Sequence, residues 1–203
     1  MFIGNDVICL NLWNSSFQKA NYERYITKVL NKSEYKILDY SDDLIYSLAI
    51  LWSCKESVFK ILMKKHQVNA FNPKAIEVNF EYNINQENSI IIAKSNAYGQ
   101  SYYSEINITS NLIHTISFTI NKADFVSNII ENNLPFQSNT NLTIELLKDI
   151  STQYTYDINF TELKKDNNNI PYILYKNKRT NIDVSLSHDG KYFSYAFLKN
   201  QSL

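Results

Sequence analysis

The order of hydrophobic and polar residues predicts a strand and then a helix at the start of the chain. Residues 1–12 alternate with period two, which puts on one face of a strand Phe2, Gly4, Asp6, Ile8 and Leu10. Asp6 therefore interrupts an otherwise apolar row. After this strand, a serine at position 15 or 16 can cap a helix whose apolar residues recur at helical spacing up to position 29.

A longer helix follows, and it carries charge within its apolar surface. Ser41 can cap its start, and the lysines at positions 64 and 65 suit the negative end of the helix dipole. At about 100° per residue, the apolar arc of this helix is formed by Leu44, Ile45, Leu48, Leu51, Trp52, Val58, Phe59 and Leu62. Lys55 falls within the arc, and Glu56 and Lys60 fall just beyond its edge. A lysine in this place requires a partner or an opening to solvent.

From Phe71 onward the sequence is typical of strands. The segments with this character are AIEVNFEYNI, SIIIAKS, YYSEINI, LIHTISFTI, TYDINF and PYILYKN. Residues 142–150 instead favour a short helix. The final segment, DVSLSHDGKYFSYAFL, predicts a hairpin, because Asp189-Gly190 is a dipeptide that tight turns prefer.

Composition and charge exclude several classes of protein. At 203 residues and 44% hydrophobic, the chain is too apolar to be disordered, and its 20 basic residues balance 20 acidic ones. We therefore expect no nucleic-acid partner and no attraction to an anionic membrane. Cys9 and Cys54 have no spacing typical of a thiolate metal site, and we expect both to be core thiols. The start of the chain lacks a basic leader, and no apolar run approaches the roughly 18 residues of a membrane span, so we expect a cytoplasmic protein.

Three features could carry chemistry: Asp6 in the first strand, Glu56 with its lysines, and Ser187-His188 before the final turn. Each has a simple structural explanation when taken singly, as a turn residue, a helix pair or a surface histidine. Taken together, the three features indicate a site for a cation and a phosphorylated ligand. Two carboxylates brought together repel each other unless a cation lies between them, and such oxygen ligands suit Mg²⁺. Lysines beside the ion then indicate a phosphorylated ligand.

These residues resemble the signature of the 4′-phosphopantetheinyl transferases. That family has a G-(I/V)-D strand, followed later in the chain by a helix with the pattern (F/W)-(S/C/T/A)-x-K-E-(A/S)-x-x-K. Here Gly4-Asn5-Asp6 and WSCKESVFK, residues 52–60, fill the pattern, with Asn5 in place of the branched apolar residue. The strand VSLSHDG at 184–190 follows the helix, an order that resembles the small holo-acyl-carrier-protein synthase type.

The resemblance implies an α+β fold, a 4′-phosphopantetheinyl-transferase-like fold in which an antiparallel sheet packs against the long helix. Residues 1–203 would form a single domain, with a β-rich insertion at about 82–159. The implied reaction moves 4′-phosphopantetheine from coenzyme A to a serine of an acyl or peptidyl carrier protein. Asp6 and Glu56 would hold Mg²⁺ on the pyrophosphate of coenzyme A. Glu56, directly or through a metal-held water, would take the serine proton.

The family pattern also assigns roles to the remaining residues. Lys60 would bind phosphate and act with Glu56 in catalysis, and Lys55 would help to anchor coenzyme A. Ser187 and His188 would contact coenzyme A phosphates. Acidic carrier proteins dock on basic surface, for which the first helix supplies as candidates Lys19, Arg24 and Lys28.

Alternatives remain open at this stage. In the small type the site lies between subunits, with the SxSH strand facing the Asp and Glu of a neighbour, so the resemblance implies a homo-oligomer. The inserted segment could instead be a diverged second lobe that completes the site within one chain. The chain could also be a catalytically impaired relative that binds a carrier protein or coenzyme A within a biosynthetic complex, or an unrelated α+β protein whose helix charges are ordinary surface chemistry.

Overall fold

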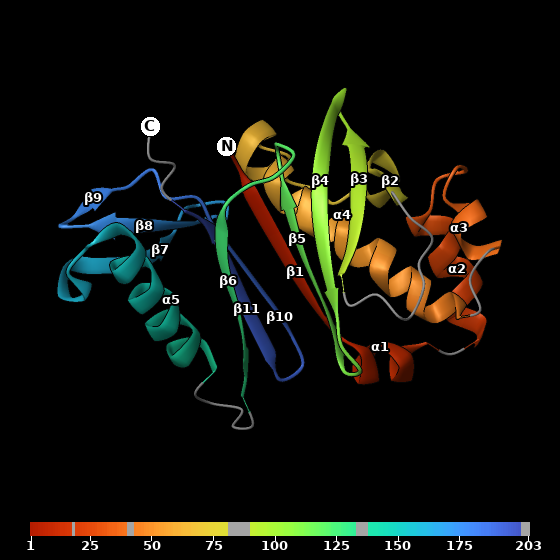
Figure 1. The fold of residues 1–203 in the computed structure, drawn as a ribbon. Helices are drawn as coiled ribbons and strands as arrows, with labels where there is room; N and C mark the ends of the chain where they lie inside the picture. Colours follow the sequence, from red (N-terminus) through yellow and green to blue (C-terminus); the bar gives the residue numbers. More distant parts are fainter. Residues whose placement is uncertain (18, 40–42, 81–89, 133–137, 200–203) are drawn as a thin grey trace.

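The fold has two lobes that lie side by side (Figure 1). A computed structural model describes residues 1–17, 19–39, 43–80, 90–132 and 138–199. The first lobe comprises residues 3–118 and the second lobe residues 125–198. In each lobe, antiparallel strands pack against a helix. Among the described residues, no helix has the length and hydropathy needed to cross a membrane.

The first lobe is built on a five-stranded antiparallel sheet with the strand order β1-β5-β4-β3-β2. Its strands are β1 (Ile3–Cys9), β2 (Glu77–Phe80), β3 (Ile90–Ala97), β4 (Gln100–Ile108) and β5 (Leu112–Phe118). β1 lies at one edge of this sheet and pairs only with β5 among the described strands. The other edge of β1 faces the second lobe, as Figure 1 shows.

Helix α4 (Leu44–His66) covers one face of this sheet and supplies more of the core than any other described element. Its cap is Asp43, whose side chain accepts a hydrogen bond from the backbone N–H of Tyr46 at 3.0 Å. The predicted cap, Ser41, lies outside the described residues. The lobe is completed by the short elements α1 (Leu10–Ser16), α2 (Lys19–Val29), α3 (Tyr35–Asp39) and η1 (Pro73–Ala75), of which α2 corresponds to the first predicted helix.

The second lobe contains helix α5 (Ser138–Tyr154) and two three-stranded antiparallel sheets, ordered β10-β11-β6 and β7-β8-β9. The strands are β6 (Phe125–Glu131), β7 (Thr161–Lys165), β8 (Pro171–Tyr175), β9 (Lys178–Arg179), β10 (Val184–Asp189) and β11 (Tyr192–Leu198). The predicted helix at 142–150 and the predicted final hairpin are both confirmed. The prediction of a strand for TYDINF was wrong, because Ile158–Phe160 forms the 3-10 helix η2, capped by the Asp157 side chain.

The two lobes share one topology. β1 pairs with β5 and β5 with β4 in the first lobe, as β6 pairs with β11 and β11 with β10 in the second. In each lobe the helix follows the first strand, and the next two strands, β2 with β3 and β7 with β8, pair with each other. The segment 82–159, expected to be an insertion, is therefore divided between the lobes. Its strands β3 to β5 complete the first sheet, and β6 and α5 begin the second lobe.

Side chains of β10 bind the free edge of β1 and so join the lobes. The backbone N–H groups of Ile3, Asn5, Val7 and Cys9 donate, in that order, to the side chains of Asp183, Ser185, Ser187 and Asp189 at 2.6, 2.9, 3.3 and 2.8 Å. The two strands advance in parallel, since every pair is separated by 180 positions. Donors that an edge strand would leave unpaired are thus satisfied by alternate residues of the neighbouring lobe.

Candidate active site

The approach of β1 to α4 is so close that only glycine fits at position 4. A Cβ atom on Gly4 would lie 1.9 Å from the backbone oxygen of Ser57. Gly4 and Ile8 face α4, whereas Ile3 and Val7 pack toward the second lobe. By the same alternation, Asp6 faces α4 next to Gly4. The first glycine of the sequence pattern therefore allows the helix to bring its charged residues against Asp6.

Asp6 is almost fully buried, with 7% of its surface exposed. Its Oδ1 accepts a hydrogen bond from Ser187 Oγ at 2.9 Å and lies 3.4 Å from Lys60 Nζ. Lys60 Nζ also donates to the backbone oxygen of Asn5 at 2.7 Å. The structure thus brings together three residues that the sequence separates widely.

Glu56 lies near Asp6, and its protonation reflects that neighbour. Burial is the main cause that raises the pKa of the Glu56 carboxyl to about 7, repulsion by Asp6 raises it further, and Lys60 acts in the opposite direction. No hydrogen bond to Glu56 occurs among the described residues. A carboxyl group in this condition accepts a proton or a cation readily near neutral pH.

The residues around the carboxylate pair fit a hard cation such as Mg²⁺. The buried Asp6 carboxylate and the half-buried Glu56 carboxylate repel each other without a cation between them. Near them, two buried hydroxyl oxygens, Thr115 Oγ1 and Tyr25 Oη, have no hydrogen-bond partner. Thr115 pairs with Asp6 across the sheet. The described residues contain no group of three or more His, Cys, Asp or Glu that could hold a metal. The pair would therefore leave most positions on the ion to water and substrate phosphate, which Mg²⁺ favours.

Lys55, expected to anchor coenzyme A, is not part of this site. Its side chain is fully buried and its Nζ lies 2.8 Å from the Glu34 carboxylate. The same nitrogen donates to the backbone oxygens of Pro73 and Ile76 at 2.8 and 2.6 Å. An ammonium group has three N–H donors, so no donor remains for a ligand. Sequence analysis placed Lys55 in the apolar arc correctly but did not identify Glu34 as its partner.

The side chains of Ser187 and His188 lie on opposite faces of β10. Ser187 faces Asp6 of the same chain, whereas the resemblance placed this strand against a neighbouring subunit. His188 lies on the other face of the strand, where its ring is exposed and stacks on Phe193 with ring centroids 5.6 Å apart. The structure therefore groups Ser187 with Asp6 and Lys60, and leaves His188 at the surface nearby.

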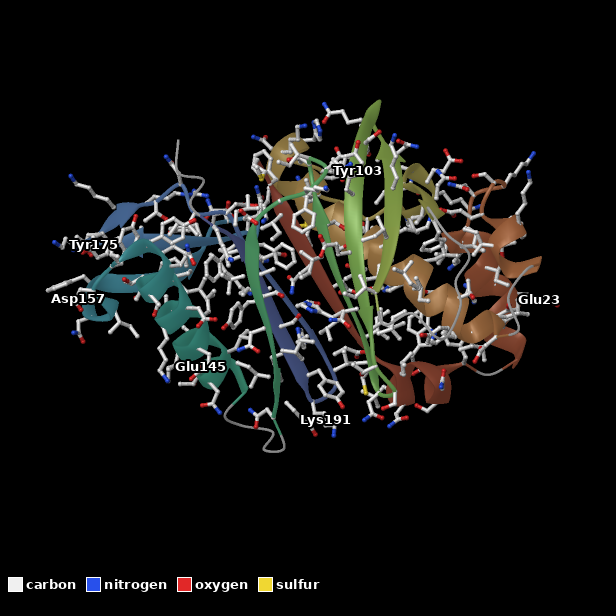
Figure 2. The ribbon with its side chains drawn as sticks, in the orientation of Figure 1. Glu23, Tyr103, Glu145, Asp157, Tyr175 and Lys191 are labelled. Atoms are coloured by element: carbon white, nitrogen blue, oxygen red, sulfur yellow. The ribbon has the colours of Figure 1, made fainter. Side chains whose placement is uncertain are left out.

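A pocket of about 470 Å³ opens beside the site, between α1, α2 and the turn after β10. Its walls are formed by Leu12, Trp13, Ser16, Phe17, Arg24, Tyr25, Lys28 and Asp189. The exposed residues Arg24 and Lys28 give its rim positive charge. Of the three cationic docking candidates, Lys19 has a side chain outside the described part of the structure. Lys191, labelled in Figure 2, lies at the end of the hairpin that β10 and β11 form.

Among its described residues, the second lobe has no carboxylate at the ladder position equivalent to Asp6. Asp6 and Thr115 form the fourth pair of the β1–β5 ladder, and Asn128 and Tyr195 form the fourth pair of the β6–β11 ladder. The hydroxyl of Tyr195 donates to Oδ2 of Asp149 on α5 at 2.5 Å. A tyrosine thus connects strand and helix in the second lobe, at the ladder position that Thr115 occupies in the first.

The fold brings Asp6, Glu56 and Lys60 of the first lobe together, and Ser187 of the second lobe contacts this group. Residues 3–116 match the family model of the 4′-phosphopantetheinyl transferase superfamily. This match covers more than half of the chain, and the protein belongs to that superfamily. The matched range coincides with the first lobe, from the start of β1 into β5. No curated protein matches the sequence.

Proposed function

We propose that this protein is a Mg²⁺-dependent transferase that moves 4′-phosphopantetheine from coenzyme A to a serine of an acyl or peptidyl carrier protein. The observation that carries the proposal is the pairing of Asp6 with Glu56 beside Lys60, within a chain that belongs to the superfamily. The order of its motifs favours the holo-acyl-carrier-protein synthase type, since the Asp6 strand and the Glu56 helix precede the SxSH strand.

Glu56 is the proposed general base. The serine hydroxyl of the carrier attacks the β-phosphorus of coenzyme A, a new P–O bond forms, and the bond to the leaving phosphate breaks to release 3′,5′-ADP. The serine proton would pass to the Glu56 carboxylate, directly or through a water. Mg²⁺ held by Asp6 and Glu56 would stabilise the charge on the phosphoryl oxygens.

Lys60 and Ser187 support this arrangement from two sides. Lys60 has one ammonium donor on the Asn5 carbonyl and another toward Asp6, which leaves a third donor for a phosphate oxygen. The Ser187 hydroxyl is committed to Asp6 and to the N–H of Val7, so we assign to it the orientation of Asp6. The exposed His188 remains a candidate contact for a coenzyme A phosphate.

The rim of the pocket is the proposed docking region for the carrier protein. Arg24 and Lys28 lie one helical turn apart on α2 and are both exposed. Their charge complements an acidic carrier surface, and Tyr25, which lines the pocket that they border, lies within the electrostatic influence of Glu56 and Asp6. A carrier bound at this rim would lie on the side of the molecule that carries the proposed catalytic residues.

One chain contains both halves of the site, which removes the reason for expecting a homo-oligomer. The strand that the resemblance placed against a neighbour donates to Asp6 of its own chain. We therefore propose that the protein acts as a monomer. Specific activity would then be independent of protein concentration, and light scattering would give the mass of a single chain. A steep loss of specific activity on dilution would contradict this.

The deciding experiment is intact-mass spectrometry of a panel of apo carrier proteins incubated with the protein, coenzyme A and Mg²⁺. We expect an EDTA-sensitive gain of one phosphopantetheine on at least one carrier, and no gain with Glu56→Gln. Measurable binding of coenzyme A without transfer to any carrier would instead identify an impaired binding protein. Absence of both transfer and binding would refute the proposal.

A further inference from the structure

Lys64, near the end of α4, connects this helix with both lobes. Its side chain is only 5% exposed, and its Nζ donates to the backbone oxygen of Ile3 at 2.6 Å and to that of Val184 at 2.8 Å. The same nitrogen lies 2.9 Å from Oδ2 and 3.0 Å from Oδ1 of Asp183. Ile3 begins β1 in the first lobe, whereas Asp183 and Val184 belong to the second lobe. One ammonium group therefore joins the helix, the edge strand and the opposite lobe.

The contacts of Lys64 leave no donor for a ligand. An ammonium group has three N–H donors, and the two backbone oxygens and the Asp183 carboxylate account for all of them. Lys60 lies four residues earlier on the same helix, and only two of its donors are engaged within the described structure. The two lysines therefore differ in role, because Lys60 can reach a phosphate whereas Lys64 is committed to the protein.

Asp183 links Lys64 to the joint, meaning the four hydrogen bonds from backbone N–H groups of β1 to alternate side chains of residues 183–189. The first of these bonds runs from the N–H of Ile3 to Oδ2 of Asp183 at 2.6 Å. The third goes to Ser187, which also contacts Asp6. Because the four acceptors stand at alternate positions of one extended segment, they line one face of it, and a shift of Asp183 along β1 shifts Ser187 as well.

We propose that Lys64 is a positioning residue for the transfer reaction: with Asp183 it fixes the register of β10 along β1, and it thereby keeps Ser187 on Asp6. This inference rests on the proposed function. The pair is mostly shielded from solvent, so salt screens it less than an exposed ion pair. Without it, three bonds of the joint and the apolar contacts between the lobes remain. Loss of the pair therefore loosens one end of the joint and does not separate the lobes.

The chain supplies a matched control in the pair of Lys55 with Glu34. Lys55 lies on the same helix and also donates to one carboxylate and two backbone oxygens, but all of these partners belong to the first lobe. The joint variant carries Lys64→Met and Asp183→Asn. The control variant carries Lys55→Met and Glu34→Gln. Each removes one ion pair of α4 without leaving an unpaired charge, and only the joint variant removes a contact between the lobes.

The first measurement is amide hydrogen exchange by NMR, which reports on the joint without any assay of activity. We expect the amides of Asn5 and Val7, whose acceptors lie on β10, to exchange at least about tenfold faster in the joint variant than in the control variant. The amides of Gly4 and Ile8, at the alternate positions of β1 that pair with β5, should exchange equally in the two variants. Equal exchange at Asn5 and Val7 would overturn the inference.

A milder substitution covers the case in which the joint variant does not fold. Asp183→Asn alone removes the charge but keeps an oxygen that can accept from the N–H of Ile3. It is compared with Glu34→Gln alone. The same two β1 amides should again exchange faster in the joint substitution, and their equal exchange would again overturn the inference.

The second measurement is steady-state transfer to an apo carrier protein. We expect the joint variant to lose about tenfold in kcat, as Ser187→Ala should, and the control variant to keep the wild-type rate where it is folded. In a Ser187→Ala background the joint substitutions should cause little further loss, because both changes act on the same contact with Asp6. Additive losses would overturn the positioning role. A wild-type protein that transfers nothing would refute the proposed function, and hydrogen exchange would still decide whether Lys64 holds the joint.

Discussion

Ser187 Oγ donates a hydrogen bond to Oδ1 of Asp6 at 2.9 Å, across 181 positions of the sequence. The same oxygen accepts the backbone N–H of Val7 at 3.3 Å. One serine of the second lobe therefore fixes both the edge strand of the first lobe and the carboxylate that this strand carries. The contact that joins the two lobes is therefore also the contact that orients Asp6.

Ser187→Ala tests this link. We expect the rate of transfer to fall by about tenfold, because Asp6 loses a hydrogen bond to a charged oxygen. Ser185→Ala is the matched control, since Ser185 accepts from the backbone N–H of Asn5 at 2.9 Å and, within the described structure, has no hydrogen bond to Asp6. Steady-state kinetics of both variants should show a loss only for Ser187→Ala. Similar rates in the two variants would contradict a role for Ser187 in orienting Asp6.

Glu56→Gln should change how stability depends on pH in the absence of metal. The folded protein raises the pKa of this carboxyl from 4.5 to about 7, so its stabilising effect is complete below pH 4.5 and is lost as the pH rises through 7. Above that pH the variant should be the more stable protein, by up to about 3 kcal/mol. Chemical denaturation at several pH values measures this difference.

Only the difference in stability between the wild-type protein and Glu56→Gln tests the pKa of Glu56. Burial lowers the pKa of His114 to about 4 from 6.5, an effect that Lys60 reinforces, and this makes both proteins less stable as the pH falls below 6.5. His114 is present in both, so its contribution cancels. A pH-independent difference between wild type and Glu56→Gln would refute the raised pKa.

Lys55→Met should reduce stability by about 3–5 kcal/mol, because it leaves the buried Glu34 carboxylate without its cation. Combining it with Glu34→Gln should recover part of that loss, since the unpaired charge is then removed as well. Denaturant titration measures both values. Coenzyme A affinity of the folded variant should be unchanged. A selective loss of affinity would instead support the ligand contact that the sequence motif implied.

Gly4→Ala should destabilise the protein by at least about 3 kcal/mol or prevent folding, because its Cβ would meet the backbone of α4 at Ser57. Gly99→Ala is the control. Gly99 has a φ of +73° but open space around its Cβ position, so only the conformational penalty of about 1 kcal/mol applies. Thermal unfolding compares the two. Equal loss of stability in the two variants would mean that α4 can move away from β1 at no cost in stability.

The sequence motif predicted which charged residues of the first lobe lie together. Asp6, Glu56 and Lys60 were selected from a carboxylate in a strand and charges at the edge of an apolar helix, and the structure places the three together. Lys55 belonged to the same motif but pairs with Glu34, because a lysine in the middle of an apolar arc must find a buried partner. The motif therefore predicts on which face of the helix a side chain lies, but not which residue that side chain contacts.

Sequence analysis offered the second lobe only as an alternative to an insertion, and it assigned no role to Tyr25. Tyr25 lies on another helix, and nothing in its local pattern marks an unsatisfied hydroxyl. The departure at Asn5 also has its reason in the second lobe, where Asn5 Nδ2 donates to Ser194 Oγ at 2.8 Å. Asn5 is fully buried, so without this contact across the lobes a polar residue would be unfavourable there.

By itself, the sequence determined the local elements: the period-two strand with Asp6, the long helix with Glu56 and Lys60, and the final hairpin at Asp189-Gly190. These follow from spacing within a few turns of chain, which backbone geometry fixes. Only the tertiary structure decided that β3 to β5 complete the first sheet, that β6 to β11 repeat its topology, and that Ser187 faces Asp6 of its own chain. The β1–β5 pairing and the contact of Ser187 with Asp6 join residues more than a hundred positions apart, and they depend on which surfaces the whole chain can bury together.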